Sequence, residues 1–185
     1  DSMICQELVN RAALELGDEV LFMPLLWLGA SHHHRNFPGT LSLNNSLYTQ
    51  VLEDMLEGLI DTGFRKIVFL NAHGGNEAPG RQALYEVQRR HGDKRDLWIV
   101  FASWMVLASE QIASLAELVQ KHVTHASELE TSMILKLNPQ LVKMDKAKGF
   151  NSSFESAFYS ADYSRPSRVG VVLPFDQSSD TGAFG

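Results

Sequence analysis

The stretch "KIVFLNAHGGNE", residues 66–77, decides how this chain folds. Its first half is a continuous apolar run with β-branched residues, which is typical of a strand covered on both faces of a sheet. The run ends on an amide, a histidine and two glycines. Because paired glycines permit a tight turn and leave room beside the backbone, the turn is expected to present His73 to a ligand.

Helix and strand signals alternate on either side of this stretch. Apolar residues at three- and four-residue spacing predict helices over 2–16, 47–64, 77–92, 109–122 and 126–138, and apolar runs predict further strands over 19–29 and 96–103. The order strand, helix, strand predicts an α/β fold, a three-layer α/β/α arrangement with a mostly parallel central sheet. We expect one domain over residues 1–185, with mostly loop from Gly149 onward.

The composition excludes several classes of protein. The 185 residues carry a formal net charge of −6 with scattered Lys and Arg, so no nucleic-acid partner is expected. No apolar run approaches the roughly 18 residues of a membrane span, so no membrane association is expected. The single cysteine, Cys5, rules out an intramolecular disulfide and fits a reducing compartment, which predicts a cytoplasmic protein.

Polar residues follow each of the three predicted strands. The carboxyl ends of parallel strands meet at one edge of a sheet, where the connecting loops form ligand sites. The residues expected at this edge are Ser31, His32, His33, His34, His73, Gly74, Gly75, Asn76 and Trp104.

A second group of candidate residues lies in "THASELETS", residues 124–132. On a helix Glu128 is turned roughly 200° from Glu130, so the two carboxylates are not expected to bind the same ion. His125 precedes this helix. A histidine and a carboxylate brought to the crevice of His73 would form half of a hydrolytic metal site.

Structural roles are the alternative for each of these residues. His73 would then be an ordinary loop histidine, the histidine run a solvated loop, and the glutamates helix caps or surface charges. The glycine turn lacks both the dinucleotide fingerprint and the Lys-Ser/Thr of a P-loop, which makes phosphate binding a weaker alternative. No Gly-x-Ser-x-Gly elbow is present to support a serine nucleophile.

Four motifs in sequence order resemble the creatininase (creatinine amidohydrolase) family. They are "DSMICQEL", "GASHHHRNFPGTLSL", "NAHGGN" and "HASELETS". The resemblance implies an α/β fold and a two-metal site built from His and carboxylates, holding zinc, manganese or iron. It also implies hydrolysis of a C–N bond in a small cyclic or linear amide substrate, and a homo-oligomer, often a hexamer.

Matched by position, the resemblance assigns a role to each candidate. Asp1, His73 and Glu130 would be metal ligands and His125 the catalytic histidine, whereas Ser31, His34, Gly74, Gly75, Asn76 and Trp104 would contact substrate.

The chain also departs from the family pattern. True creatininases read His-Tyr-Glu-Asn where this chain has "HGGN", so creatinine is not the expected substrate. The family's leading metal motif is absent apart from Asp1. We therefore expect a core fragment, truncated at both ends, with weak or no metal binding. The alternative is a non-catalytic small-molecule-binding or interaction domain that keeps the fold.

Overall fold

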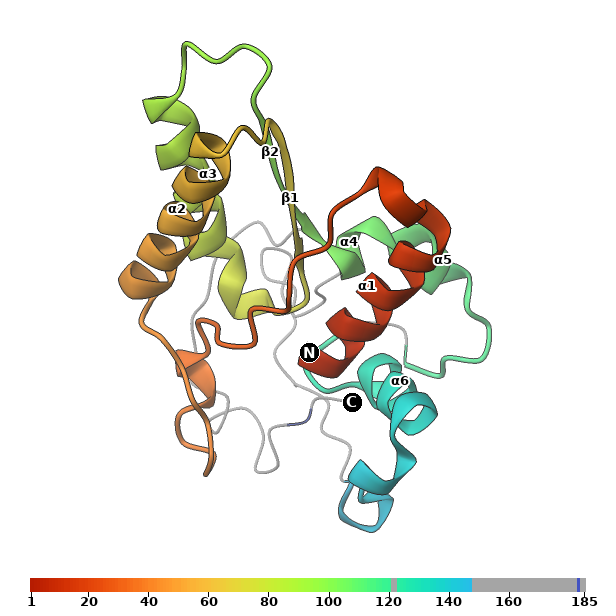
Figure 1. Cartoon of the computed structure of the whole chain (residues 1–185). Helices are drawn as coiled ribbons and strands as arrows, with labels where there is room; N and C mark the ends of the chain where they lie inside the picture. Colours follow the sequence, from red (N-terminus) through yellow and green to blue (C-terminus); the bar gives the residue numbers. More distant parts are fainter. Residues whose placement is uncertain (121–122, 148–182, 184–185) are drawn as a thin grey trace, which may run out of the picture.

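The computed structural model describes residues 1–120, 123–147 and 183, and it has helices on both sides of a parallel sheet (Figure 1). The helices are α1 (Ser2–Leu16), α2 (Asn45–Asp61), α3 (Glu77–Arg90), α4 (Trp104–Leu107), α5 (Ser109–Ser114) and α6 (Glu128–Leu137). The strands are β1 (Lys66–Asn71) and β2 (Trp98–Ser103). Short 3-10 turns include η2 (His32–His34) and η3 (Gly74–Asn76). The predicted α/β class with a parallel sheet is confirmed.

The sheet of the described residues consists of β1 and β2, which pair in parallel from Lys66 opposite Trp98 to Asn71 opposite Ser103. Parallel neighbours need a crossover, and α3 supplies it. Helices α2 and α3 cover one side of the sheet and α1 lies on the other (Figure 1). Both strands therefore end at the same edge, and the N-terminus lies at that edge too.

The main core lies between the sheet and helices α2 and α3. Its buried members are Leu56, Ile60, Ile67, Val87 and Leu97, with Phe69 and Ile99 packed against them. Burying such a side chain stabilises the fold by roughly 1.5–3 kcal/mol relative to leaving it exposed. Periodic apolar residues on α2 and α3 thus cover the inward face of the strands, as the sequence predicts.

Among the described residues, the opposite face of the sheet is covered only near the carboxyl ends of the strands. Leu70 packs there against a second core cluster that includes Ile4 of α1 and Trp104. Farther back, Val68 is 66% exposed and Val100 is 41% exposed. The expectation that the strand is covered on both faces is therefore wrong for its first half.

Three sequence-based boundaries are also wrong. The strand expected over residues 19–29 does not form: residue 19 ends a 3-10 turn, residues 21–29 have no regular secondary structure, and Leu21, Met23 and Trp27 are exposed. Pro24 lacks the N–H that a sheet ladder needs. The helix expected over 109–122 ends at Ser114. Helix α6 begins at Glu128 rather than near Ala126, because Ala126 has a left-handed φ of 47°.

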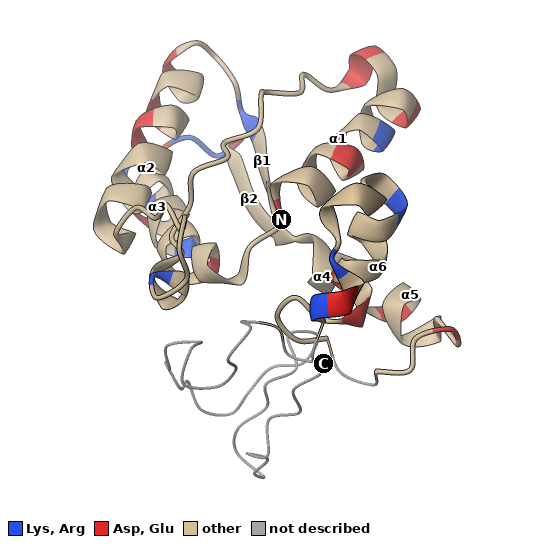
Figure 2. Ribbon diagram, turned by 90° about the horizontal axis from the view of Figure 1, so that it is seen from below, with Lys and Arg blue, Asp and Glu red and all other residues tan. Residues whose placement is uncertain are grey.

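The charged residues of the described chain are spread over its helices rather than gathered in one basic stripe (Figure 2). Helix α2 is joined to the end of α3 by ion pairs, in which Arg90 contacts both Glu53 and Glu57. No helix among the described residues combines the length and the apolar character needed to cross a bilayer. The predicted loop region from Gly149 onward lies outside the described residues.

Candidate metal centre

The turn after β1 is built around Asn71, which is buried with 4% exposure. Its Nδ2 donates to the carbonyl oxygen of His73 at 2.9 Å and to Oε1 of Glu77 at 3.2 Å, and its Oδ1 accepts from the His73 N–H at 3.2 Å. A buried amide with these partners holds the turn in one conformation. The position of His73 is consequently set by the residue that ends the strand.

The segment that carries the histidine run docks directly on this turn. The Ala30 N–H donates to Oδ1 of Asn76 at 2.9 Å, and the Ala30 carbonyl oxygen lies 3.2 Å from Nε2 of His73. An added Cβ on Gly75 would lie 2.1 Å from that carbonyl oxygen, so the approach requires glycine. Ser31 and the histidines therefore reach the end of β1 through turn contacts, not through the sheet ladder that the sequence predicts.

The ring of His73 lies between two acceptors. Its Nδ1 is 2.9 Å from Oδ2 of Asp1, and its Nε2 faces the Ala30 carbonyl. Burial lowers the pKa of His73, partly offset by the contact with Ala30, which favours the neutral ring. A neutral ring has one N–H and one lone pair, so it donates to one side and offers a ligand atom on the other. Metal-bound histidines have this arrangement, because their second nitrogen donates to a carboxylate or carbonyl.

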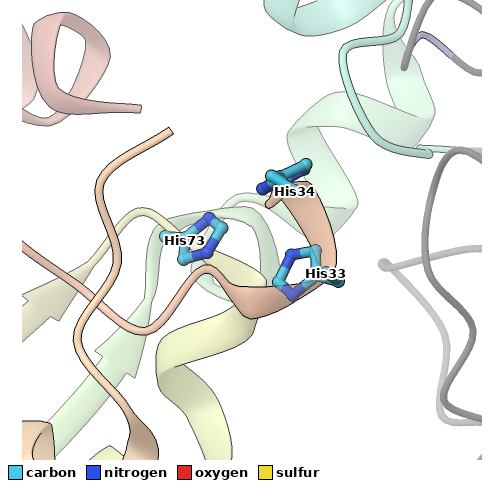
Figure 3. A group of neighbouring side chains, drawn as sticks. All are labelled: His33, His34 and His73. Carbon is cyan, nitrogen blue, oxygen red and sulfur yellow. The ribbon is translucent and has the colours of Figure 1, made fainter. Parts of the chain in front are cut away.

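Two more histidines surround His73 (Figure 3). His33 stacks on His73 with ring centroids 5.4 Å apart and planes 11° apart, and it lies 4.2 Å from His34. Each of the three offers a ligand nitrogen, and these atoms lie within 4.8 Å of one another. Burial, followed by the charges of neighbouring histidines, lowers the pKa of His33 to about 4 and that of His34 to about 3. Neutral rings are the form that binds metal, so these histidines are in the protonation state that a divalent cation requires.

A chain of side-chain contacts extends from this cluster to His125. The Ser31 hydroxyl is 2.6 Å from Nδ1 of His34, and Nε2 of His34 is 3.0 Å from Nε2 of His125. Burial and the charge of His73 lower the pKa of His125 to about 4. Each contact joins groups that can both donate and accept, so a proton can pass along the chain.

The two glutamates of α6 serve different regions. The Oε2 atom of Glu130 accepts from the Ala126 N–H at 2.7 Å, and its charge interacts with that of His73. Burial raises the pKa of Glu130, with this hydrogen bond as an offset. Glu128 instead accepts from the Gln120 N–H at 2.7 Å. The two carboxylates thus have different hydrogen-bond partners, which agrees with the predicted divergence.

The remaining candidates are placed as follows. Gly74 and Asn76 belong to η3 beside His73. Trp104 is only 7% exposed and packs in the second core cluster with Ile4 and Leu129, so it is not brought to the histidine rings as a surface group. Its assignment to substrate contact stays a prediction.

The residue-by-residue prediction missed Asn71 as the group that positions the turn, and it gave no role to His33. The sequence did carry a signal for Asn71, because it is an amide at the end of a predicted strand. It carried none for His33, since three consecutive histidines look alike in sequence.

A parallel α/β fold with histidines and carboxylates at the carboxyl edge of its strands has the donor set expected of a metal-binding α/β protein. The sequence profile of the creatininase family, described as creatinine amidohydrolase, matches residues 1–185. The chain belongs to the creatininase family.

Curated relatives and solved structures agree with this membership. The chain is 26% identical over 158 residues to creatinine amidohydrolase of Pseudomonas putida, covering 79% of this chain and 60% of that protein. It is also 26% identical over 158 residues to 3-dehydro-scyllo-inosose hydrolase of Thermotoga maritima, covering 81% of this chain and 49% of that protein.

Among solved structures, a glutamate-to-glutamine mutant of creatininase complexed with creatine superposes with a TM-score of 0.66 at 26% identity, covering 84% of this chain and 65% of that one. A manganese form of creatininase gives a TM-score of 0.64 at 25% identity, covering 81% of this chain and 62% of that one. The chain thus spans between 49% and 65% of the length of these four proteins.

Proposed function

We propose that this chain forms part of a metal-dependent amidohydrolase that cleaves a C–N bond in a small cyclic or linear amide. The observation that carries the proposal is the setting of His73, a neutral ring held between the Asp1 carboxylate and the Ala30 carbonyl with further histidines around it. Support also comes from family membership and from similarity to a creatininase that binds creatine.

We assign the cation to Asp1, His73 and Glu130. The Asp1 carboxylate lies 2.9 Å from the His73 ring and Glu130 interacts electrostatically with His73, and such a mixed set suits zinc, manganese or iron. A divalent cation there would polarise the substrate carbonyl and lower the pKa of water. The similar manganese creatininase supports a divalent ion. Two ions per site remain our expectation for the intact family site.

His125 is assigned to proton transfer. Its lowered pKa keeps the ring neutral near pH 7, so it can accept a proton during attack and release it to the leaving nitrogen. His34 holds Nε2 of His125 from the opposite side and is itself contacted by Ser31. Ser31 and His34 thus fix the orientation of the His125 ring and form the adjoining pocket wall.

The turn residues would shape the substrate side of the site. Gly74 and Gly75 carry no side chain, and Asn76 holds the Ala30 segment in place. Because position 75 has no room for a carboxylate, we expect a substrate other than creatinine. We further propose that the protein is cytoplasmic and forms a homo-oligomer, with the hexamer that the family resemblance implies. The rival is a non-catalytic domain that keeps the fold without a working metal site.

Metal analysis of the purified protein tests the proposal. After incubation with Zn²⁺ or Mn²⁺ and removal of excess ion, we expect bound metal in the parent protein and its loss in His73→Ala. His91→Ala is the matched control, because His91 contacts Glu57 far along the α2–α3 pair. Equal metal content in the parent and His73→Ala would favour the non-catalytic rival. Hydrolysis is then screened against cyclic and linear amides.

A further inference from the structure

Both ring nitrogens of His34 are engaged, one by a serine and the other by a second histidine. Nδ1 lies 2.6 Å from the Ser31 hydroxyl, and Nε2 lies 3.0 Å from Nε2 of His125. Ser31 directly precedes η2 and His34 ends it, whereas His125 precedes α6. The three polar groups therefore form a continuous chain of contacts between two segments that are distant in the sequence.

Neighbouring imidazoles disfavour a charge on either ring of this chain. The ring centroid of His34 lies 4.2 Å from that of His33, 4.4 Å from that of His125 and 5.8 Å from that of His73. Like charges this close destabilise one another, so neutral rings are favoured. A neutral imidazole has one N–H and one lone pair, and His34 must therefore donate through one nitrogen and accept through the other.

Two arrangements of protons satisfy both contacts. In the first, the Ser31 hydroxyl donates to Nδ1 of His34, the Nε2–H of His34 donates to His125, and His125 carries its proton on Nδ1. In the second, the Nδ1–H of His34 donates to the Ser31 oxygen, the Nε2–H of His125 donates to His34, and Nδ1 of His125 has the lone pair. The direction of the Ser31 hydroxyl therefore decides whether Nδ1 of His125 is an acid or a base.

We propose that Ser31 and His34 form a proton relay that sets which nitrogen of His125 carries its proton, so that His125 changes from base to acid without becoming charged. The proposal rests on the proposed function in assigning proton transfer to His125. It gives Ser31 and His34 a part in that transfer beyond orienting the ring. Both are positioning residues in this role, because the relay acts on the substrate through His125.

The relay keeps its protons balanced at each step. When Nδ1 of His125 takes a proton from the attacking water, the Nε2 proton of His125 passes to Nε2 of His34. The Nδ1 proton of His34 then passes to the Ser31 oxygen, and the proton of the serine leaves to solvent, which the partial exposure of Ser31 permits. When the Nδ1–H of His125 protonates the leaving nitrogen, the same shifts run backward and solvent returns a proton to Ser31.

The tautomers of the metal-free protein test the relay without any substrate. Nitrogen-15 NMR of histidine-labelled protein at pH 7.5 distinguishes an N–H from a lone pair at each ring nitrogen, and His34→Gln and His125→Gln assign the signals. We expect His34 and His125 to carry their protons on opposite nitrogens, Nδ1 in one ring whenever it is Nε2 in the other. Protons on the same type of nitrogen in both rings of the parent protein would overturn the proposal.

Removing the serine hydroxyl should change both tautomers together. Because a buried N–H is rarely left without a partner, Ser31→Ala should favour the lone pair on Nδ1 of His34 and thus the Nδ1–H of His125. Ser31→Thr keeps the hydroxyl and should keep the parent tautomers. Thr40→Val is the matched control, because Thr40 donates to the carbonyl oxygen of His34 and not to its ring. Identical tautomers in Ser31→Ala and the parent would overturn the relay and leave the proposed function standing.

Kinetics on the best amide from the screen test whether the reaction uses the relay. We expect Ser31→Ala to lower kcat by about tenfold or more with KM within about twofold, and Ser31→Thr to restore most of kcat. In mixtures of light and heavy water the parent kcat should curve with deuterium fraction, because several protons move together, whereas Ser31→Ala should give a straight line. An unchanged kcat in Ser31→Ala, beside a lowered kcat in His125→Gln, would overturn the relay alone. Failure to cleave any amide would overturn the proposed function, and the tautomers would still decide the proton arrangement.

Discussion

The Nε2 atoms of His34 and His125 lie 3.0 Å apart, although the residues are 91 positions apart in the chain. His34 comes from the segment docked on the glycine turn, and His125 precedes α6 at the left-handed Ala126. One ring must donate and the other accept, so the pair holds a single proton between them. The Ser31 hydroxyl, 2.6 Å from His34, fixes the far side of that ring.

Replacing His125 tests its catalytic assignment. We expect His125→Gln to lower kcat by about 10²- to 10⁴-fold with a smaller change in KM, because general acid–base catalysis typically contributes this much. Steady-state kinetics on the best amide from the screen give both constants. His91→Gln should leave them unchanged, and a His125→Gln protein with the parent kcat would exclude the assignment.

The stability of the metal-free protein should depend on pH through the histidine cluster. The pKa values of His33, His34 and His125 are lowered to about 4, 3 and 4, below the value near 6.5 of unfolded histidine. Between these limits the unfolded chain binds more protons than the folded one, so the free energy of unfolding falls as pH falls from about 6.5 toward 4.

Urea denaturation at pH 7.5 and pH 5 measures this dependence. His34→Gln should reduce the difference in stability between the two pH values, since one half-buried neutral ring no longer has to become charged. Glu130 acts in the opposite sense, because its raised pKa lets the folded state retain a proton above the ordinary value for glutamate. Equal stability of the parent protein at both pH values would show that these rings are charged in the folded state or solvated.

Adjacent glycines of η3 should respond differently to alanine. Gly75→Ala places a Cβ 2.1 Å from the Ala30 carbonyl oxygen, so the docked segment must shift, and we expect a loss of about 1–3 kcal/mol in stability. The Cβ added by Gly74→Ala has no atom within 4 Å, so this substitution should change stability by less than about 0.5 kcal/mol. Thermal unfolding compares the two, and an equal shift would contradict the close approach seen at Gly75.

The parts of the fold that the sequence predicted depend on local pattern. The periodic apolar residues of α2 and α3 and the apolar run of β1 each specify an element without reference to the rest of the chain. Residues 19–29 carry the same local signal as a strand, but pairing is a long-range property that composition does not encode. The burial of Trp104 could not be predicted for the same reason, because it follows from packing against α1 and α6.

The site was predictable where a residue ended an element and not where contacts between loops decide. His73 and its glycines follow β1 in sequence, so their position could be inferred from the strand alone. The approach of His33 depends on the fit of Ala30 against Gly75, two segments more than 40 residues apart. No pattern within the histidine run distinguishes His33 from its exposed neighbour His32.

Ser127 should be destabilising as it stands. It is 2% exposed, and its Oγ has no hydrogen-bond partner among the residues that the structure describes. It occupies the N-cap position of α6 but makes no side-chain cap bond there. An unsatisfied buried hydroxyl costs about 1–3 kcal/mol, so we expect Ser127→Ala to raise the free energy of unfolding by up to about 1 kcal/mol. Urea denaturation at pH 7.5 measures the change.

Thr49→Val is the control of opposite sign. The Thr49 hydroxyl donates to the carbonyl of Pro79, so its removal should lower the free energy of unfolding. A loss of stability in Ser127→Ala would mean that this hydroxyl has a partner in the folded protein.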